Sequence, residues 1–262
     1  MTELNHPHAP GWLSRVLLTP CLLVMLSWLG VLSLAWNLVA VGLYRLLPDA
    51  RGRAVGQHGV SWVYRIFWAT ARMSGMLRID NAALAALRDE PGGLIIAANH
   101  PSLLDALIII ARVPRTVCIM KASLMDNVFL GAGSRLARYI ANDSPRQMIR
   151  GAVERLKQGD HLVLFPEGTR SPSPTQVHPF RPGITLMAHR AGVPIQTVLI
   201  ETDSPYLGKG WPLWKLPPLP VVFRARLGER FAPDADHEAL LARLEDYFKQ
   251  ELGQAPGKDA GP

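Results

Sequence analysis

The chain has 262 residues, of which 48% are hydrophobic, and its 28 Lys and Arg outnumber 21 Asp and Glu to give a net charge of +7. This length suits one large domain or two, and the hydrophobic share is high for a purely soluble protein, which indicates membrane contact. A basic surface fits nucleic acid, acidic substrates or anionic lipid equally well. The two cysteines, Cys21 and Cys118, lack a metal-ligand spacing and fit a reducing compartment, which argues against a disulfide framework.

The N-terminal part is predicted to attach to a membrane. Residues 1–15 form a polar tail, and the run 16–44 that follows contains no charged residue. About 20 apolar helical residues cross a bilayer core, so this run predicts a transmembrane helix within a membrane-associated helical segment at residues 16–76. The alternatives are a shallow hairpin bent near Gly30 and a helix buried in the protein core.

Flanking charge predicts the orientation of this segment. Arg45, Arg51 and Arg53 follow the apolar run, against Arg15 before it, which places the rest of the chain on the cytoplasmic side, at the inner membrane if the protein is bacterial. Residues 60–77 carry aromatic and aliphatic side chains at helical spacing between arginines. That pattern fits an interfacial helix and a core helix equally.

Residues 77–252 read as one domain in which short apolar strands alternate with helical patterns. Such alternation predicts an α/β fold with a mostly parallel sheet flanked by helices, followed by a flexible Gly- and Pro-rich tail at residues 253–262. The expected strands are 94–97, 116–120, 138–141, 161–165, 195–201 and 221–227, and the expected helices are 102–111, 121–136, 145–158, 182–191 and 237–252.

A first polar motif follows the strand at 94–97. His100 and Asp105 stand at this strand-to-helix turn, and the carboxyl ends of strands are where ligands bind in open α/β sheets. A histidine can take a proton from a hydroxyl near neutral pH, and a carboxylate on its other ring nitrogen fixes the tautomer. The structural alternative is a capping box, in which Ser102 and Asp105 close a helix N-terminus.

A second polar motif, Phe-Pro-Glu-Gly-Thr-Arg at residues 165–170, ends the strand at 161–165. Gly168 would let a ligand approach the backbone, and Arg170 offers a planar fork for phosphate. A tight turn with a solvated arginine is the alternative for this motif alone.

Together, the two motifs resemble the glycerolipid acyltransferase family typified by bacterial lysophosphatidic acid acyltransferase. Its N-H-x-x-x-x-D and F-P-E-G-T-R blocks match residues 99–105 and 165–170 in the same order, and Phe-Arg-Pro-Gly at 180–183 is similar to a looser later block. The resemblance covers about residues 77–230. It identifies 77–252 as an acyltransferase domain.

The resemblance implies transfer of an acyl group from coenzyme A or acyl carrier protein to a lysophospholipid hydroxyl, most directly that of 1-acyl-glycerol-3-phosphate, on a membrane bilayer. His100 would be the base and Asp105 its partner, with no metal, prosthetic group or nucleic acid involved. The residues expected to hold the acceptor are Glu167, Gly168, Thr169, Arg170, Lys121 and, as a substitute, Arg146.

One departure from the family keeps the acceptor open. Members acting on lysophosphatidic acid usually carry an arginine in a second block, and the corresponding segment 136–143 lacks it at that place, with Asp143 nearby and Arg146 a few residues further on. A different lysolipid, such as a lyso-aminolipid, is therefore the alternative acceptor. A non-catalytic, membrane-attached lipid-binding protein is the alternative of another class. Neither G-x-S-x-G nor a glycine-rich phosphate loop occurs, which argues against a serine hydrolase or a nucleotide-binding protein.

Overall fold

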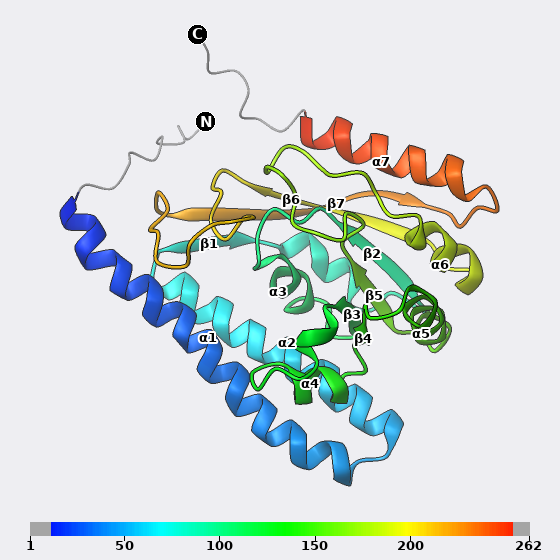
Figure 1. Ribbon diagram of the computed structural model, residues 1–262, viewed down its shortest axis with the longest axis horizontal. Helices are drawn as coiled ribbons and strands as arrows, with labels where there is room; N and C mark the ends of the chain where they lie inside the picture. The colour runs from blue at the N-terminus through cyan, green and yellow to red at the C-terminus, as the bar shows by residue number, and fades with distance from the viewer. Residues whose placement is uncertain (1–11, 254–262) are drawn as a thin grey trace.

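The computed structural model describes residues 12–253. A seven-stranded sheet lies between two layers of helices, and a long helical hairpin extends along one side (Figure 1). The tail expected at 1–15 lies mostly outside the described residues, although the first helix already begins at Trp12. The tail expected at 253–262 also falls outside them, apart from Gly253, which ends the last helix.

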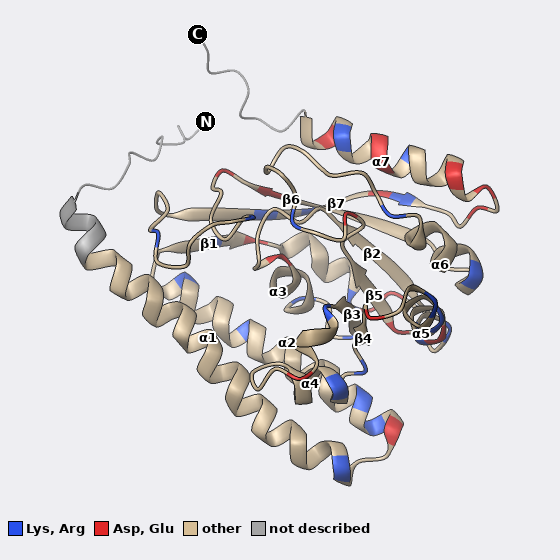
Figure 2. Cartoon of the chain, viewed as in Figure 1, with Lys and Arg blue, Asp and Glu red and all other residues tan. Residues whose placement is uncertain are grey.

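The hairpin consists of α1 (Trp12–Leu46) and α2 (Asp49–Met73). The chain reverses at Leu47 and Pro48, where proline precedes the first turn of α2. The alternative of a bend near Gly30 is therefore wrong, because α1 continues through that residue. Leu17–Leu46 is long and apolar enough to cross a membrane by length and composition. Between Arg15 in its first turn and Arg45 in its last turn, α1 carries no charged residue (Figure 2).

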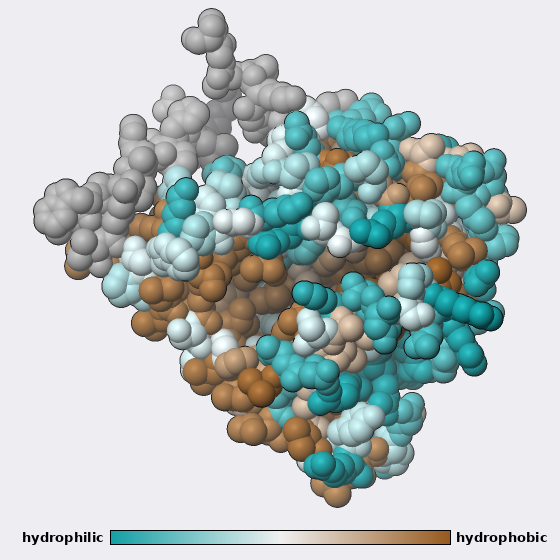
Figure 3. All heavy atoms as spheres, in the orientation of Figure 1, coloured by the Kyte–Doolittle hydropathy of each residue, from teal (hydrophilic) through white to brown (hydrophobic). Residues whose placement is uncertain are grey.

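A single stripe of α1 is covered by protein. Its buried side chains include Leu22, Ser33 and Asn37, while most of its other apolar side chains are exposed and form the hydrophobic surface visible along the hairpin (Figure 3). Asn37 accepts a hydrogen bond from the Gly133 amide at 2.9 Å and donates to the Phe129 carbonyl. These bonds tie α1 to the domain.

Helix α2 belongs to the core more than to an interface. Val63, Phe67 and Trp68 are buried against the sheet, whereas Trp62 and Met73 are exposed. The sequence pattern fitted a core helix and an interfacial helix equally. In the structure one face of α2, at helical spacing, packs in the core, and the opposite face is exposed.

The strand order is β1-β7-β6-β2-β5-β3-β4. Strands β6, β2, β5, β3 and β4 run parallel to one another, and β7, which pairs with β6 antiparallel, pairs in turn with β1 in parallel. The expected mostly parallel sheet is confirmed. The strands are β1 (Leu77–Asp80), β2 (Leu94–Ala98), β3 (Thr116–Met120), β4 (Ile140–Ala141), β5 (His161–Leu164), β6 (Ile195–Thr202) and β7 (Val221–Phe231).

Two cores fill the two faces of the sheet. In β2, Ile96 and Ala98 point into the core shared with α1, α2 and α3, whereas Ile95 and Ala97 point into the core under α5, α6 and α7. Burial on both faces explains why this strand is a continuous apolar run. The remaining helices are η1 (Ala82–Leu87), α3 (Asp105–Ile110), η2 (Ala122–Leu124), α4 (Gly131–Leu136), α5 (Pro145–Lys157), α6 (Gly183–Ala191) and α7 (His237–Gly253).

Three elements differ from what the sequence predicted. The helix expected at 121–136 is broken into η2 and α4 by a turn at Asn127, whose side-chain oxygen accepts from the Phe129 amide at 2.8 Å and whose carbonyl accepts from the Gly131 amide at 2.7 Å. The strand expected at 138–141 begins only at Ile140, since Arg138 takes a left-handed backbone with φ of 62°. Strand β1 was not expected at all, being four residues long at the sheet edge.

The contact between α2 and α4 yields a prediction. A Cβ on Gly56 would lie 2.4 Å from the Ala137 backbone nitrogen, whereas a Cβ on Gly42 meets nothing within 4 Å. Gly56→Ala should therefore destabilise the protein by about 1–3 kcal/mol. Gly42→Ala should be neutral or stabilise by up to about 1 kcal/mol, because alanine is the better helix former. Thermal unfolding of both variants in detergent checks this, and equal melting temperatures would contradict close packing of these helices.

Candidate active site

Strand pairing brings the two polar motifs together. Ala97 of β2 lies in register with Leu164 of β5, so His100 and residues 165–170 leave the sheet at the same edge. The two strands are direct neighbours and parallel, which places their carboxyl ends about 5 Å apart. Segments far apart in sequence therefore form one site.

His100 and Asp105 make a direct hydrogen bond. The His100 Nδ1 atom lies 2.9 Å from Asp105 Oδ2, and the same oxygen accepts from the Ser102 amide at 2.7 Å. Asp105 is also the first residue of α3. One oxygen thus makes both the hydrogen bond to His100 and the bond from the Ser102 amide that the capping interpretation expects, and the catalytic interpretation stays a prediction.

Burial sets the electrostatics of Asp105. The residue is fully buried, and desolvation raises the pKa of its carboxyl to about 6 even though the hydrogen bonds from His100 and Ser102 favour the charged form. Its Oδ1 atom finds no hydrogen-bond partner among residues 12–253. A carboxylate held this way stabilises positive charge on the imidazole without needing to accept its proton.

The His100 ring is stacked on an aromatic side chain, and the backbone before it is fixed by Asn99. Its ring stacks on Phe165 with centroids 4.0 Å apart. The preceding Asn99 fixes the end of β2, since its amide donates to the Ile200 carbonyl at 2.9 Å and its oxygen accepts from the Ile200 amide at 2.7 Å. The side chain of His100 keeps 19% of its surface exposed, so a substrate can reach the ring.

Glu167 is hydrogen-bonded to the backbone of His100. It is buried, and its carboxylate accepts from the backbone amides of His100 at 3.3 Å and His178 at 2.8 Å. It also accepts from the Ser171 hydroxyl, which itself accepts from the His100 amide at 3.0 Å. Ser171 was not identified from the sequence. Its only signal there is that it directly follows the second motif.

Arg170 joins the motif to a loop between β6 and β7. Its Nη1 atom donates to the carbonyls of Leu207 at 2.9 Å and Gly208 at 2.7 Å. The Nε and Nη2 atoms make no hydrogen bond within the described part of the chain and stay free to bind a ligand. Sequence reasoning did not connect this loop with the site, because nothing local in the sequence indicates the contact.

Gly168 occupies a position that requires glycine. Its φ is +68°, and an added Cβ would lie 2.2 Å from Arg181 Nε. The Arg181 amide donates to the Pro166 carbonyl at 2.9 Å, which holds this arginine against the motif. Gly168 and Thr169 are exposed. Arg181 is thus a further cation beside the motif that was not among the expected site residues.

Lys121 and Arg146 lie at the same edge of the sheet but at different distances. Lys121 directly follows β3, two strands from β2, or about 10 Å at ordinary strand spacing. Arg146 lies in the first turn of α5, beyond β4, which is a strand further out. Both side chains are exposed. The fold therefore brings Lys121 toward His100 more closely than Arg146.

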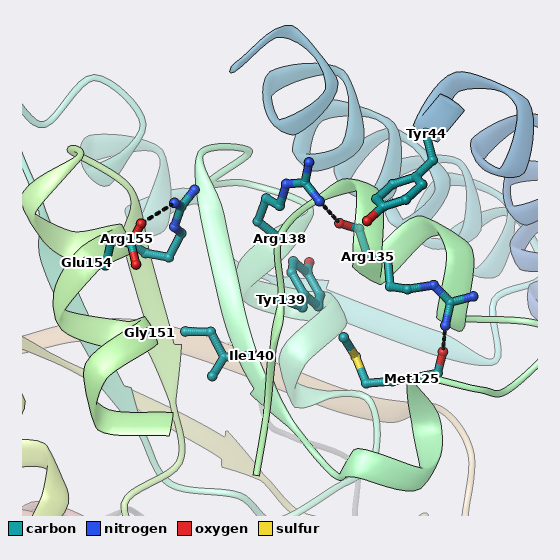
Figure 4. A pocket seen from close by; sticks show the side chains of 9 residues that line it. All are labelled: Tyr44, Met125, Arg135, Arg138, Tyr139, Ile140, Gly151, Glu154 and Arg155. Carbon is teal, nitrogen blue, oxygen red and sulfur yellow. Dashed lines mark hydrogen bonds and ion pairs between the residues drawn. The ribbon is translucent and has the colours of Figure 1, made fainter. Parts of the chain in front are cut away.

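A pocket of about 320 Å³ lies elsewhere, between α1, α4 and α5 (Figure 4). None of its lining residues belongs to either polar motif. Three arginines line it, and each has a carboxylate partner that balances its charge. The pairs are Arg135 with Asp126, Arg138 with Asp49, and Arg155 with Glu154.

Comparison with known proteins finds similar acyltransferases. The model of the family described as Acyltransferase matches residues 79–201. A 1-acyl-sn-glycerol-3-phosphate acyltransferase of Pseudomonas aeruginosa is 26% identical over 70% of this chain and 71% of its own length. A lyso-ornithine lipid O-acyltransferase of the same organism is 28% identical over 74% of each chain.

The fold has a counterpart among solved structures. The crystal structure of a 1-acyl-sn-glycerophosphate acyltransferase from Thermotoga maritima superposes with a TM-score of 0.62 at 20% identity, covering 94% of this chain and 99% of that one. At this identity the match shows a likeness of fold. With an Acyltransferase domain at residues 79–201, the chain is an acyltransferase, similar to the 1-acyl-sn-glycerol-3-phosphate acyltransferases.

Proposed function

We propose that the enzyme moves a fatty acyl group from a thioester, on coenzyme A or acyl carrier protein, to the free hydroxyl of a lysophospholipid, with 1-acyl-glycerol-3-phosphate as the leading acceptor. The observation that carries this proposal is the 2.9 Å hydrogen bond between His100 Nδ1 and Asp105 Oδ2 beside an intact Phe-Pro-Glu-Gly-Thr-Arg turn. A base of this kind acts on an alcohol directly. The non-catalytic lipid-binding alternative is not retained, because the chain is an acyltransferase.

In the proposed mechanism, His100 Nε2 removes the proton from the acceptor hydroxyl. The hydroxyl oxygen attacks the thioester carbonyl, the carbon–sulfur bond breaks, and His100 returns the proton to the departing thiolate. Asp105 keeps Nδ1 protonated and stabilises the transient imidazolium. A thioester is already activated, so the mechanism needs no metal or prosthetic group.

Acceptor binding is assigned to the exposed part of the second motif. The free guanidinium nitrogens of Arg170 suit a phosphate group, and the Gly168 backbone and Thr169 hydroxyl lie on the same exposed turn. Lys121 adds charge at the same edge of the sheet. Glu167, by contrast, would act through His100 and Ser171, because its carboxylate is already fully engaged.

A lyso-aminolipid is the second candidate acceptor. The arginine usual in the second block is missing, and the similarity to a lyso-ornithine lipid O-acyltransferase is as extensive as that to the phosphatidic acid-forming relatives. We place the enzyme at the membrane through the exposed apolar side of α1, with its domain on the cytoplasmic face, the inner membrane in a bacterium.

The base and its partner can be tested separately from stability. His100→Ala should lower kcat by about 10²–10⁴-fold, since general-base catalysis is worth that much. Asp105→Asn should be nearly as harmful, because an amide favours the wrong tautomer of the imidazole. Initial rates with acyl thioester and lysophosphatidic acid, together with melting temperatures, measure both effects. Full activity in a folded His100→Ala protein would refute the mechanism.

The raised pKa of Asp105 predicts opposite pH effects on rate and stability. The rate should fall as the pH drops through about 6, because the protonated carboxyl cannot stabilise the imidazolium. Because burial raises this pKa, the protonated carboxyl favours the folded state at low pH. This contribution to the free energy of unfolding is lost as the pH rises through about 6. Asp105→Asn should therefore be at least as stable as the wild type at pH 8. A marked loss of stability there would mean that the ionised carboxylate supports the fold.

The acceptor can be identified by kinetics on two lysolipids. With lysophosphatidic acid, Arg170→Ala should raise KM about ten- to hundredfold, the value of one charge-assisted contact. Arg146→Ala, at the more distant sheet edge, should change it less. Negligible wild-type turnover on lysophosphatidic acid, with turnover on a lyso-ornithine lipid, would select the second candidate.

A further inference from the structure

The loop between β6 and β7, residues 203–220, has a base anchored at the site. Leu207 is buried, and its carbonyl accepts hydrogen bonds from Arg170 at 2.9 Å and from the Leu103 amide at 3.1 Å. The Gly208 carbonyl accepts a second bond from Arg170. The base of the loop thus touches the turns of both motifs.

The tip of the same loop exposes apolar surface in a defined conformation. Trp214 is 72% exposed and Leu213 is 51% exposed. The neighbouring Trp211 donates its indole N–H to the Lys215 carbonyl at 3.1 Å, and the Lys215 ammonium lies 4.5 Å from the centre of its ring. These contacts hold the tip in shape, so the exposure of Trp214 is built into the fold.

The chemistry of the tip fits a lipid surface. Tryptophan beside lysine is the combination that settles at the boundary between acyl chains and headgroups. Residues 208–220 contain two lysines and no acidic residue, which complements anionic headgroups. The loop also packs against the core cluster that contains Leu22 of α1, at the end of the sheet nearest the N-terminal half of that helix (Figure 1).

We propose that residues 211–215 insert into the interface of the bilayer that holds the acceptor, as a membrane contact separate from α1. A chain attached through α1 keeps this tip within reach of the lipid, which favours a bilayer over a protein partner. A coupling follows if the proposed function holds: the inserted tip would steady the Leu207 and Gly208 carbonyls and thereby Arg170.

A depth measurement tests the contact without using activity. The background is the full-length Cys21→Ser protein, whose remaining cysteine, Cys118, is buried. A nitroxide is attached at Leu213→Cys. The control label is attached at Glu238→Cys, because Glu238 is exposed on α7 on the other face of the sheet. In vesicles of phosphatidylcholine and phosphatidylglycerol, the label at 213 should collide mainly with oxygen and the label at 238 mainly with a water-soluble nickel chelate. Equal water access at both sites would overturn the proposal. Dipolar broadening between labels at 213 would overturn it too, by showing a second copy of the chain on the tip.

Kinetics test the coupling. The double variant Leu213→Ser, Trp214→Ser should lose several-fold in rate on a long-chain acceptor embedded in vesicles and retain its rate on a short-chain acceptor dissolved as monomer. An equal loss on both would overturn the coupling. If the wild type turns over neither acceptor, the proposed function fails, while the depth measurement still decides the membrane contact.

Discussion

The parallel pairing of β2 with β5 is the constraint on which the site depends. Their register sets Ala97 beside Leu164, and both chains then leave the sheet at one edge. Asn99 extends this order by binding the Ile200 backbone on the other neighbouring strand. The position of His100 therefore follows from three strands that are held together by backbone hydrogen bonds.

Two carboxylates are buried at this edge of the sheet, and burial of each costs desolvation free energy that hydrogen bonds must offset. Glu167 satisfies two backbone amides and the Ser171 hydroxyl, so its buried carboxylate is compensated by hydrogen bonds. Asp105 is compensated less fully, with one oxygen bonded twice and the other unpartnered within the described chain. The difference separates a carboxylate that supports the turn from one whose charge is available to the imidazole.

The helical hairpin combines two environments on one chain. Gly56, Gly59 and Gly133 allow the helices to approach each other, with Trp36 filling the space that side chains at two of these positions would take. On the opposite side α1 presents apolar side chains to its surroundings. The protein thus joins an α/β domain to an exposed apolar surface, and the loop between β6 and β7 exposes a second, smaller apolar surface at its tip.

The sequence by itself determined the fold class, most element bounds and the two motifs, because apolar periodicity and motif spacing are local properties. The His100 and Asp105 pair was predictable for the same reason, since five residues separate them across one turn. Only the tertiary structure decided that Glu167 and Ser171 both accept hydrogen bonds from the His100 amide. It also decided that Arg170 donates to the Leu207 carbonyl. It also decided the break in the helix expected at 121–136, where Gly131 lies close to the Met125 carbonyl. These contacts join residues distant in sequence or depend on close backbone approach, and neither leaves a periodic trace in the chain.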